Sequence, residues 1–306
     1  MAASAFPDFY IVGAAKAGTT SLVEMLREHE QVWFPHEKEP HHFFLRKDDR
    51  AWTIRDGAKV LPLADALPYA SEEAYLALYS DAPSGVLSGD ASTQYLVNNT
   101  AAGAIHAQKP DAKIVAVLRN PTARAYSAFV HARSRGEEAC GDFSYALDEC
   151  FAGERATAFA TNYVAEGDYA RHLKVWKGMF GDRLHVILFD DLLSEPQAVF
   201  DRLTRFLGIA QRALPAASAS HKNASIEITN PIAYAFRMAA KRLRRLAPGL
   251  FELPLFRRPY EALLARMGRK PDALSADQKA RLDDYYAPQL TILESMIGRD
   301  LSKWRA

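Results

Sequence analysis

The sequence predicts an α/β fold in which helices flank a central, mainly parallel sheet. Short apolar runs alternate with helical stretches along the chain, and this alternation is typical of a parallel sheet. One run, IVAVL at residues 114–118, is apolar throughout, as expected for a strand buried on both faces. Another run leads through a glycine-bearing loop directly into a helix, which is the repeating unit of such a fold.

The first two strand–helix units lie in the N-terminal half of the chain. The first has a strand at residues 9–12 and a helix from Thr19, where apolar residues begin to recur at helical spacing. The second has the strand at residues 114–118, which an Asn-Pro pair ends. Its helix is expected from about Thr122.

A third unit and a C-terminal helix complete the expected elements. The third strand covers residues 184–189. We expect Ser194 to cap the helix that follows, Pro196 to lie early in it, and Gly208 to end it. A serine three residues before a glutamine predicts a capping box at the start of a helix over residues 275–297.

Length and composition limit the domain organisation and the class of protein. The 306 residues fit a single domain, with a basic, mostly helical C-terminal extension at about 231–306. Thirty-eight Lys+Arg against thirty-seven Asp+Glu give a net charge of +1, which argues against a nucleic-acid-binding protein. Two cysteines cannot form a disulfide framework. The N-terminus lacks the features of a signal peptide, and no apolar stretch approaches the length of a membrane span, so we expect a cytoplasmic protein.

The loop GAAKAGTTS, residues 13–21, is suited to binding an anion. A helix N-terminus offers unpaired N–H groups and a partial positive charge, and Lys16 can add a full charge. The spacing departs from a Walker A motif, because Thr19 and not a lysine follows Gly18. The alternative is a plain strand-to-helix turn with a solvated lysine.

This loop resembles the 5′-phosphosulfate-binding loop of sulfotransferases that use 3′-phosphoadenosine 5′-phosphosulfate (PAPS). In that family, an arginine at a strand end and a serine eight residues later bind the 3′-phosphate, and Arg119 and Ser127 have that separation. Taken alone, Arg119 is more simply interpreted as forming a salt bridge at the end of a strand. Ser127 alone is more simply interpreted as a solvent-facing position on a helix. With similar stretches at residues 167–209 and 280–304, the resemblance covers most of residues 8–304.

The resemblance implies a P-loop-like fold and PAPS as the sulfuryl donor. Relatives close a loop over the nucleotide near the position of HKNAS. The implied donor-binding residues are Lys16, Ala17, Gly18, Thr19, Thr20, Ser21, Arg119, Ser127, Lys222 and Asn223.

The segment HEKEPHHFF, residues 36–44, resembles the E-x-H-x-F segment of heparan sulfate sulfotransferases and many bacterial relatives. In those enzymes the glutamate is the general base. The match assigns this role to Glu39, with His41 assisting or orienting it. Cytosolic small-molecule sulfotransferases use a histidine instead, so His41 or His42 remains an alternative. An exposed charged loop and a two-histidine metal site are the other interpretations.

Two departures from the heparan-type pattern concern the acceptor. Phe44 stands where those enzymes often have an acid, and Ala91 in SGDASTQYL replaces a lysine. The missing lysine argues against heparan sulfate itself as the acceptor, but not against the transfer chemistry. Ser92 and Tyr95 keep the pattern and are expected to line the site, with a packing role as the alternative for Tyr95.

The resemblance thus implies transfer of a sulfuryl group from PAPS to a hydroxyl or amine of a carbohydrate or glycosylated acceptor, without a metal. Lys16 and the helix N-terminus would offset the developing charge. One alternative is a P-loop-type ATP-dependent kinase or phosphotransferase. Another is a non-catalytic protein that binds a nucleotide or a membrane surface, since residues 237–270 carry ten Lys+Arg and two Glu. This segment could contact an anionic membrane or form a solvated helix pair, and the sequence leaves the oligomeric state open.

Overall fold

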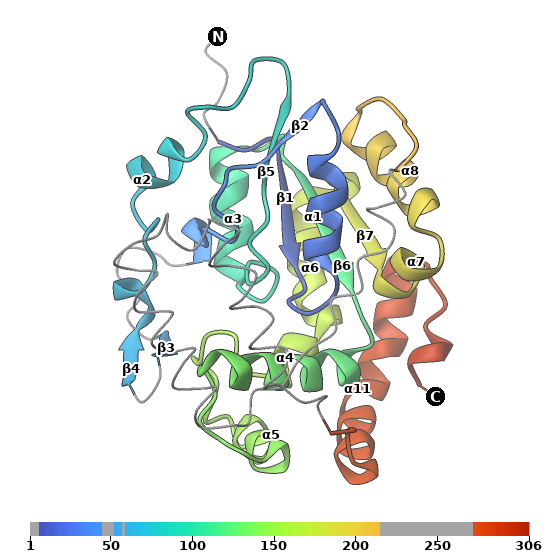
Figure 1. The fold of residues 1–306 in the computed structure, drawn as a ribbon. Coiled ribbons are helices and arrows are strands. Elements are labelled where there is room, and N and C mark those ends of the chain that lie inside the picture. The colour runs from blue at the N-terminus through green and yellow to red at the C-terminus, as the bar shows by residue number, and fades with distance from the viewer. Residues whose placement is uncertain (1–5, 45–51, 57–58, 215–271, 306) are drawn as a thin grey trace, which may run out of the picture.

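The computed structural model describes residues 6–44, 52–56, 59–214 and 272–305. Its centre is a five-stranded sheet in the order β2-β5-β1-β6-β7, in which all paired strands are parallel (Figure 1). The predicted α/β fold with a mainly parallel sheet is therefore confirmed. The strands are β1 (Phe9–Gly13), β2 (Val32–Trp33), β5 (Leu87–Asp90), β6 (Lys113–Leu118) and β7 (Leu184–Leu188).

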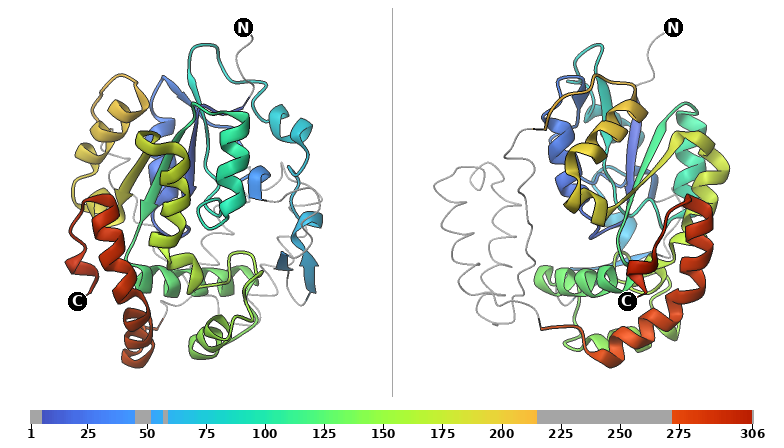
Figure 2. Two further views of the ribbon diagram at one scale, coloured as in Figure 1. Left: turned by 180° about the vertical axis from the view of Figure 1, so that it is seen from behind. Right: turned by 90° about the vertical axis from the view of Figure 1, so that its right-hand side faces the viewer.

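Helices cover both faces of this sheet. Helix α1 lies on one face and helices α3 and α6 lie on the other (Figure 2). A separate antiparallel hairpin consists of β3 (Thr53–Asp56) and β4 (Lys59–Pro62). The α-helices are α1 (Thr19–Arg27), α2 (Glu72–Ala77), α3 (Asn99–Gln108), α4 (Pro121–Arg135), α5 (Phe143–Phe151), α6 (Tyr169–Phe180), α7 (Phe189–Ser194), α8 (Pro196–Leu207) and α11 (Ala276–Ile297). Short 3₁₀ helices are η1 (His42–Phe44), η2 (Leu63–Asp65), η3 (Ala165–Gly167), η4 (Gly181–Arg183) and η7 (Ser302–Trp304).

The parallel register brings the carboxyl ends of three central strands to one edge of the sheet. Strand β6 is buried from Ile114 to Leu118, as its apolar run predicts. Gly13 of β1 pairs with Ala116 of β6, while Tyr10 of β1 pairs with Asp90 at the end of β5. The segments that follow β1, β5 and β6 therefore leave the sheet close together.

The third strand–helix unit differs from the prediction between its strand and its helix. Strand β7 ends at Leu188, and the next six residues form α7. Ser194 is the last residue of that helix, where its hydroxyl donates to the carbonyl of Asp190, so the prediction that Ser194 caps the following helix is wrong. Pro196 does begin α8, and Gly208 ends it in a left-handed conformation with φ of 76°.

The C-terminal helix α11 begins as predicted, with a complete capping box between Ser275 and Gln278. It packs against α4 and α6, and the Tyr286 hydroxyl donates to the carbonyl of Val164 at 2.7 Å. Residues 215–271, which hold much of the expected basic extension, lie outside the described part of the chain. None of the described helices is long and apolar enough to cross a membrane.

Candidate active site

The loop between β1 and α1 leaves the N-terminus of α1 available to a ligand. Gly18 is the N-cap residue in a left-handed conformation, with φ of 87°, and no side chain caps the helix. A Cβ atom on Gly18 would lie 2.7 Å from the ring of Phe189, so the close packing here requires glycine. The first turn of α1 contains no acidic residue. Its N–H groups and partial positive charge therefore favour an anion.

Positive charges from separate segments gather around this loop. Burial and the charges of Arg119, Lys38 and Arg135 lower the pKa of Lys16 to about 8, against the opposing effect of Glu39. These cations come from the loop itself, the end of β6, the segment after β2 and the last turn of α4. Their mutual repulsion is relieved when an anion binds between them.

Arg119 connects the two predicted anion-binding motifs. Its Nη1 atom donates to the main-chain carbonyl of Lys16 at 3.1 Å, and its guanidinium lies 5.1 Å from the ring centroid of Phe189. Burial lowers the pKa of Arg119. Arg119 forms no ion pair within the described residues, so the interpretation as a strand-end salt bridge finds no support there.

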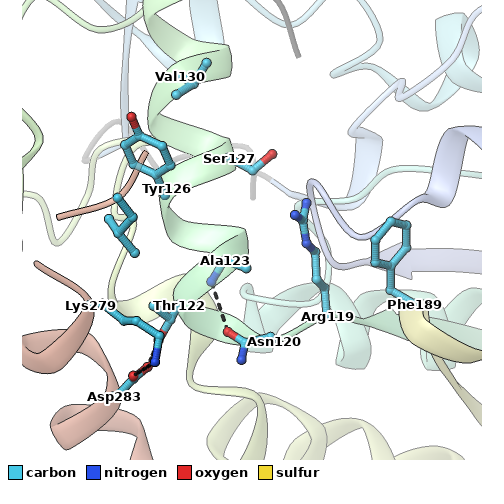
Figure 3. Close-up of a pocket in the computed structure, with 11 residues that line it drawn as sticks. Arg119, Asn120, Thr122, Ala123, Tyr126, Ser127, Val130, Phe189, Lys279 and Asp283 are labelled. Atoms are coloured by element: carbon cyan, nitrogen blue, oxygen red, sulfur yellow. Dashed lines mark hydrogen bonds and ion pairs between the residues drawn. The ribbon is translucent and has the colours of Figure 1, made fainter. Parts of the chain in front are cut away.

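Arg119 and Ser127 line the same cavity, which has a volume of about 620 Å³. Figure 3 shows the Ser127 side chain pointing from α4 toward the space beside Arg119, with Phe189 on the other side of the guanidinium. The cavity extends to Tyr126 and Val130 on α4. The spacing of eight residues in sequence thus places a guanidinium and a hydroxyl against one cavity, as a phosphate site requires.

Glu39 lies close to the anion loop and is held by three side chains. The hydroxyl of Thr93 donates to Oε2 at 3.0 Å. Nε2 of His41 is 3.5 Å from the same oxygen, and Nζ of Lys38 is 3.2 Å from Oε1. Burial acts to raise the pKa of Glu39, but His41 and Lys38 outweigh it and lower the pKa to about 2. Glu39 is therefore ionised at neutral pH.

The two adjacent histidines point in different directions. His41 contacts Glu39, and its main-chain N–H donates to the hydroxyl of Ser92 at 3.0 Å. His42 instead has Nδ1 2.9 Å from the carbonyl of Tyr69, and its ring stacks on Tyr75 with 4.3 Å between centroids. His42 thus lies away from the carboxylate, and of the two histidines only His41 contacts Glu39.

The buried carboxylate of Asp90 binds several hydroxyl groups beneath the segment that contains Glu39 and His41. Its carboxylate accepts hydrogen bonds from Tyr75 at 2.8 Å, Ser92 at 2.7 Å and Tyr95 at 3.1 Å, and burial raises its pKa. The Tyr95 hydroxyl also accepts the main-chain N–H of Phe43. Tyr95 is fully buried. It therefore has a packing role, which was the alternative to its lining the site. Ser92 contacts the main chain of the segment that contains Glu39 and His41.

Three residues near Glu39 were not identified from the sequence as site residues. Lys38 contacts both Glu39 and the hydroxyl of Thr20, at 2.8 Å; its position beside the glutamate was the available signal. Thr93 lies in the stretch SGDASTQYL, but no role was assigned to it. Arg135, which influences the pKa of Lys16, lies at the far end of α4, and its sequence position alone carries no signal.

Some predicted features lie outside the described residues. These are Lys222, Asn223 and the basic segment 237–270. Within the described residues, no three or more His, Cys, Asp or Glu side chains are grouped so that they could hold a metal ion. Arg124, by contrast, forms a buried ion pair with Glu166 at 3.1 Å, which is a structural role.

Comparisons with known proteins agree with this geometry. The model of the sulfotransferase family matches residues 7–212. Human heparan sulfate glucosamine 3-O-sulfotransferase 6 is 31% identical over 209 residues, covering 67% of this chain and 53% of the relative. Human carbohydrate sulfotransferase 15 is 25% identical over 306 residues, covering 85% and 53%. The chain spans about half the length of the curated relatives it matches.

A solved sulfotransferase from Alicyclobacillus acidocaldarius has the same fold over nearly the whole length of both chains. It is 26% identical, its TM-score is 0.71, and the match covers 98% of this chain and 99% of that one. These matches set aside the kinase alternative. The chain belongs to the sulfotransferase family.

Proposed function

We propose that this enzyme transfers the sulfuryl group of PAPS to a hydroxyl or amine of a carbohydrate or glycosylated acceptor, with Glu39 as the general base. One observation carries the proposal. The hydrogen bond from Arg119 to the carbonyl of Lys16 joins two motifs that are 103 residues apart in sequence, and Glu39 interacts electrostatically with Lys16 in the same region. Donor-binding cations and a candidate base therefore share one site.

The residues at this site suit a nucleotide that carries phosphate groups at both the 3′ and the 5′ positions of its ribose. The N-terminus of α1 and Lys16 would hold the 5′-phosphosulfate, and Arg119 and Ser127 would hold the 3′-phosphate. The N-terminus of α1 supports this assignment, because no side chain caps it and its first turn contains no acidic residue. When bound, the donor supplies an electrophilic sulfuryl group attached to a phosphate.

Glu39 is suited to take the proton of the acceptor. It is ionised at neutral pH, because His41 and, to a smaller extent, Lys38 lower its pKa, and a base must be unprotonated before it acts. His41 orients the carboxylate through Nε2. Lys16 would stabilise the charge that develops on the oxygens of the donor. No metal is needed in this scheme.

The names of the relatives support a carbohydrate acceptor. Those compared above are a carbohydrate sulfotransferase and a heparan sulfate glucosamine 3-O-sulfotransferase. Ala91 stands where heparan-type enzymes have a lysine, and it is buried. For this reason we propose an acceptor other than heparan sulfate itself.

Two measurements test the proposed function. Calorimetry should show that the protein prefers adenosine 3′,5′-bisphosphate (PAP) to ADP, because ADP lacks the 3′-phosphate. Labelled-sulfate transfer from PAPS should then be assayed with carbohydrate acceptors and with an extract of the native host. Equal binding of the two nucleotides together with no transfer of label would overturn the proposal.

A further inference from the structure

The ammonium of Lys38 lies between the anion-binding helix and the proposed base. Its Nζ atom is 2.8 Å from Oγ1 of Thr20 and 3.2 Å from Oε1 of Glu39. Thr20 is the second residue of α1. One cation thus contacts both the helix end where an anion is expected and the carboxylate that is expected to take the acceptor's proton.

The positive charge of Lys38 lies in an electrostatically unfavourable position, which Glu39 or a bound anion can offset. The N-terminus of a helix has a partial positive charge that disfavours a neighbouring cation. Lys38 also repels Lys16, whose pKa is lowered by burial, Arg119 and Lys38 in that order. Within the described residues, Glu39 is the carboxylate that forms an ion pair with Lys38. A bound anion at α1 would compete with Glu39 for this ammonium.

His41 is the larger cause of the lowered pKa of Glu39, and the contact with Lys38 lowers it further, which weakens Glu39 as a base. A carboxylate whose pKa is about 2 has little affinity for a proton. The Lys38 and Glu39 side chains are 31% and 30% exposed, so a ligand can reach them. His41 and Thr93 hold the other carboxylate oxygen, Oε2, and would keep Glu39 in place if Lys38 moved.

We propose that Lys38 is a positioning residue that holds Glu39 in the donor-free enzyme and moves to the phosphosulfate oxygens of the donor when it binds. The inference rests on the proposed function, because it takes the ligand at α1 to be the donor. Glu39 then becomes more basic only when a nucleotide occupies the donor site. In the transfer, the S–O bond to the 5′-phosphate breaks and the acceptor oxygen bonds to sulfur. The acceptor's proton passes to Glu39.

A direct test is the structure of the wild-type protein with bound PAP. The 5′-phosphate of PAP should draw Nζ of Lys38 away from Oε1 of Glu39, breaking the contact of 3.2 Å. If Lys38 remains on Glu39 while the phosphate lies at the N-terminus of α1, the inference is wrong. This measurement needs no variant.

A second test follows the titration of Glu39 by carbon NMR of its carboxyl group, with and without PAP. The titratable and charged groups that face Glu39 are His41 and Lys38, together with Lys16 and Arg135. In the wild type, PAP should raise the midpoint by about 1 pH unit or more, since the carboxylate loses a cation and gains an anionic neighbour. In Lys38→Met, the midpoint of the free protein should already be raised, and PAP should shift it less.

Lys174→Met is the matched control, because Lys174 is an exposed lysine on α6. This variant should titrate as the wild type does. Equal PAP-induced shifts in the wild type and Lys38→Met would refute the role of Lys38 even if PAPS is the donor. If PAP does not bind the wild type at all, the proposed function fails, and the inference fails with it.

Discussion

Replacement of Arg119 by methionine separates recognition of the 3′-phosphate from support of the anion loop. Arg119→Met keeps a long apolar side chain against Phe189 but removes the guanidinium. A hydrogen bond to a charged group contributes about 1.5–3 kcal/mol, and 1.4 kcal/mol is about a tenfold change in affinity. The dissociation constant for PAP should therefore rise by about 10- to 150-fold.

ADP provides the internal comparison. The variant also loses the hydrogen bond from Nη1 to the carbonyl of Lys16, and any loosening of the loop affects both nucleotides. Only PAP has a 3′-phosphate, so the ratio of the two dissociation constants isolates that contact. Calorimetry should give a PAP-to-ADP preference that falls toward 1 in Arg119→Met.

Ser127→Ala is the matched control, because Ser127 lines the same cavity and has no hydrogen bond to the loop among the described residues. Loss of its hydroxyl should weaken PAP binding by about 2- to 12-fold, in line with about 0.5–1.5 kcal/mol per hydrogen bond and tenfold per about 1.4 kcal/mol, and leave ADP unchanged. If Arg119→Met weakened PAP and ADP equally, Arg119 would act by holding the Lys16 loop, and its assignment to the 3′-phosphate would be refuted.

Three further predictions concern the base, the loop lysine and the core. Glu39→Gln should lower turnover in the labelled-sulfate assay by about 10²-fold or more while PAP still binds normally; normal turnover would remove Glu39 as the base. Because the pKa of Lys16 is lowered to about 8, Lys16 loses its charge as pH rises through that value, so kcat/KM for the donor should fall above about pH 8. Lys16→Arg should abolish this fall, and an unchanged profile would contradict it. Arg124→Met leaves buried Glu166 without its partner and should cost about 3–5 kcal/mol in urea unfolding; Arg124→Met/Glu166→Leu should recover part of this loss.

Local signals in the sequence were sufficient for the elements that frame the site. The apolar run of β6 predicts burial on both faces, and burial is found from Ile114 to Leu118. The separation of Arg119 and Ser127 was recognised from the resemblance, and the end of β6 and helix α4 place the two side chains against one cavity. These features depend on residues close together in sequence, so a single sequence can reveal them.

Strand β5 could not be predicted in the same way. Its sequence is LSGD. It contains no apolar run, and Ser, Gly and Asp are not strand-forming residues. It forms a strand because β1 and β2 pair with its two edges. A Cβ on Gly89 would lie 2.6 Å from the ring of Phe34, so the glycine permits close packing. The burial of Asp90 depends on the hydroxyls of Tyr75 and Tyr95, which only the folded chain brings together.

The backbone departs from local preference at the proposed active site itself. Among the described non-glycine residues, positive φ angles occur at Lys16 (68°), Glu39 (61°), His41 (56°) and Ala160 (58°), and three of these four are the proposed catalytic residues. Such conformations cost about 1–3 kcal/mol each, so the surrounding structure must impose them. Arg119 holds the carbonyl of Lys16, and the Ser92 hydroxyl accepts the N–H of His41.

These supporting contacts come from residues that directly follow β5 and β6, far from the strained residues in sequence. Residue types and motif spacing identified which side chains take part, because that information is local. The directions in which those side chains point come from left-handed backbone conformations that the central sheet maintains. Local rules of sequence are broken where function requires a particular orientation, so the strain at Glu39 and His41 is itself an argument that this segment is the centre of the chemistry.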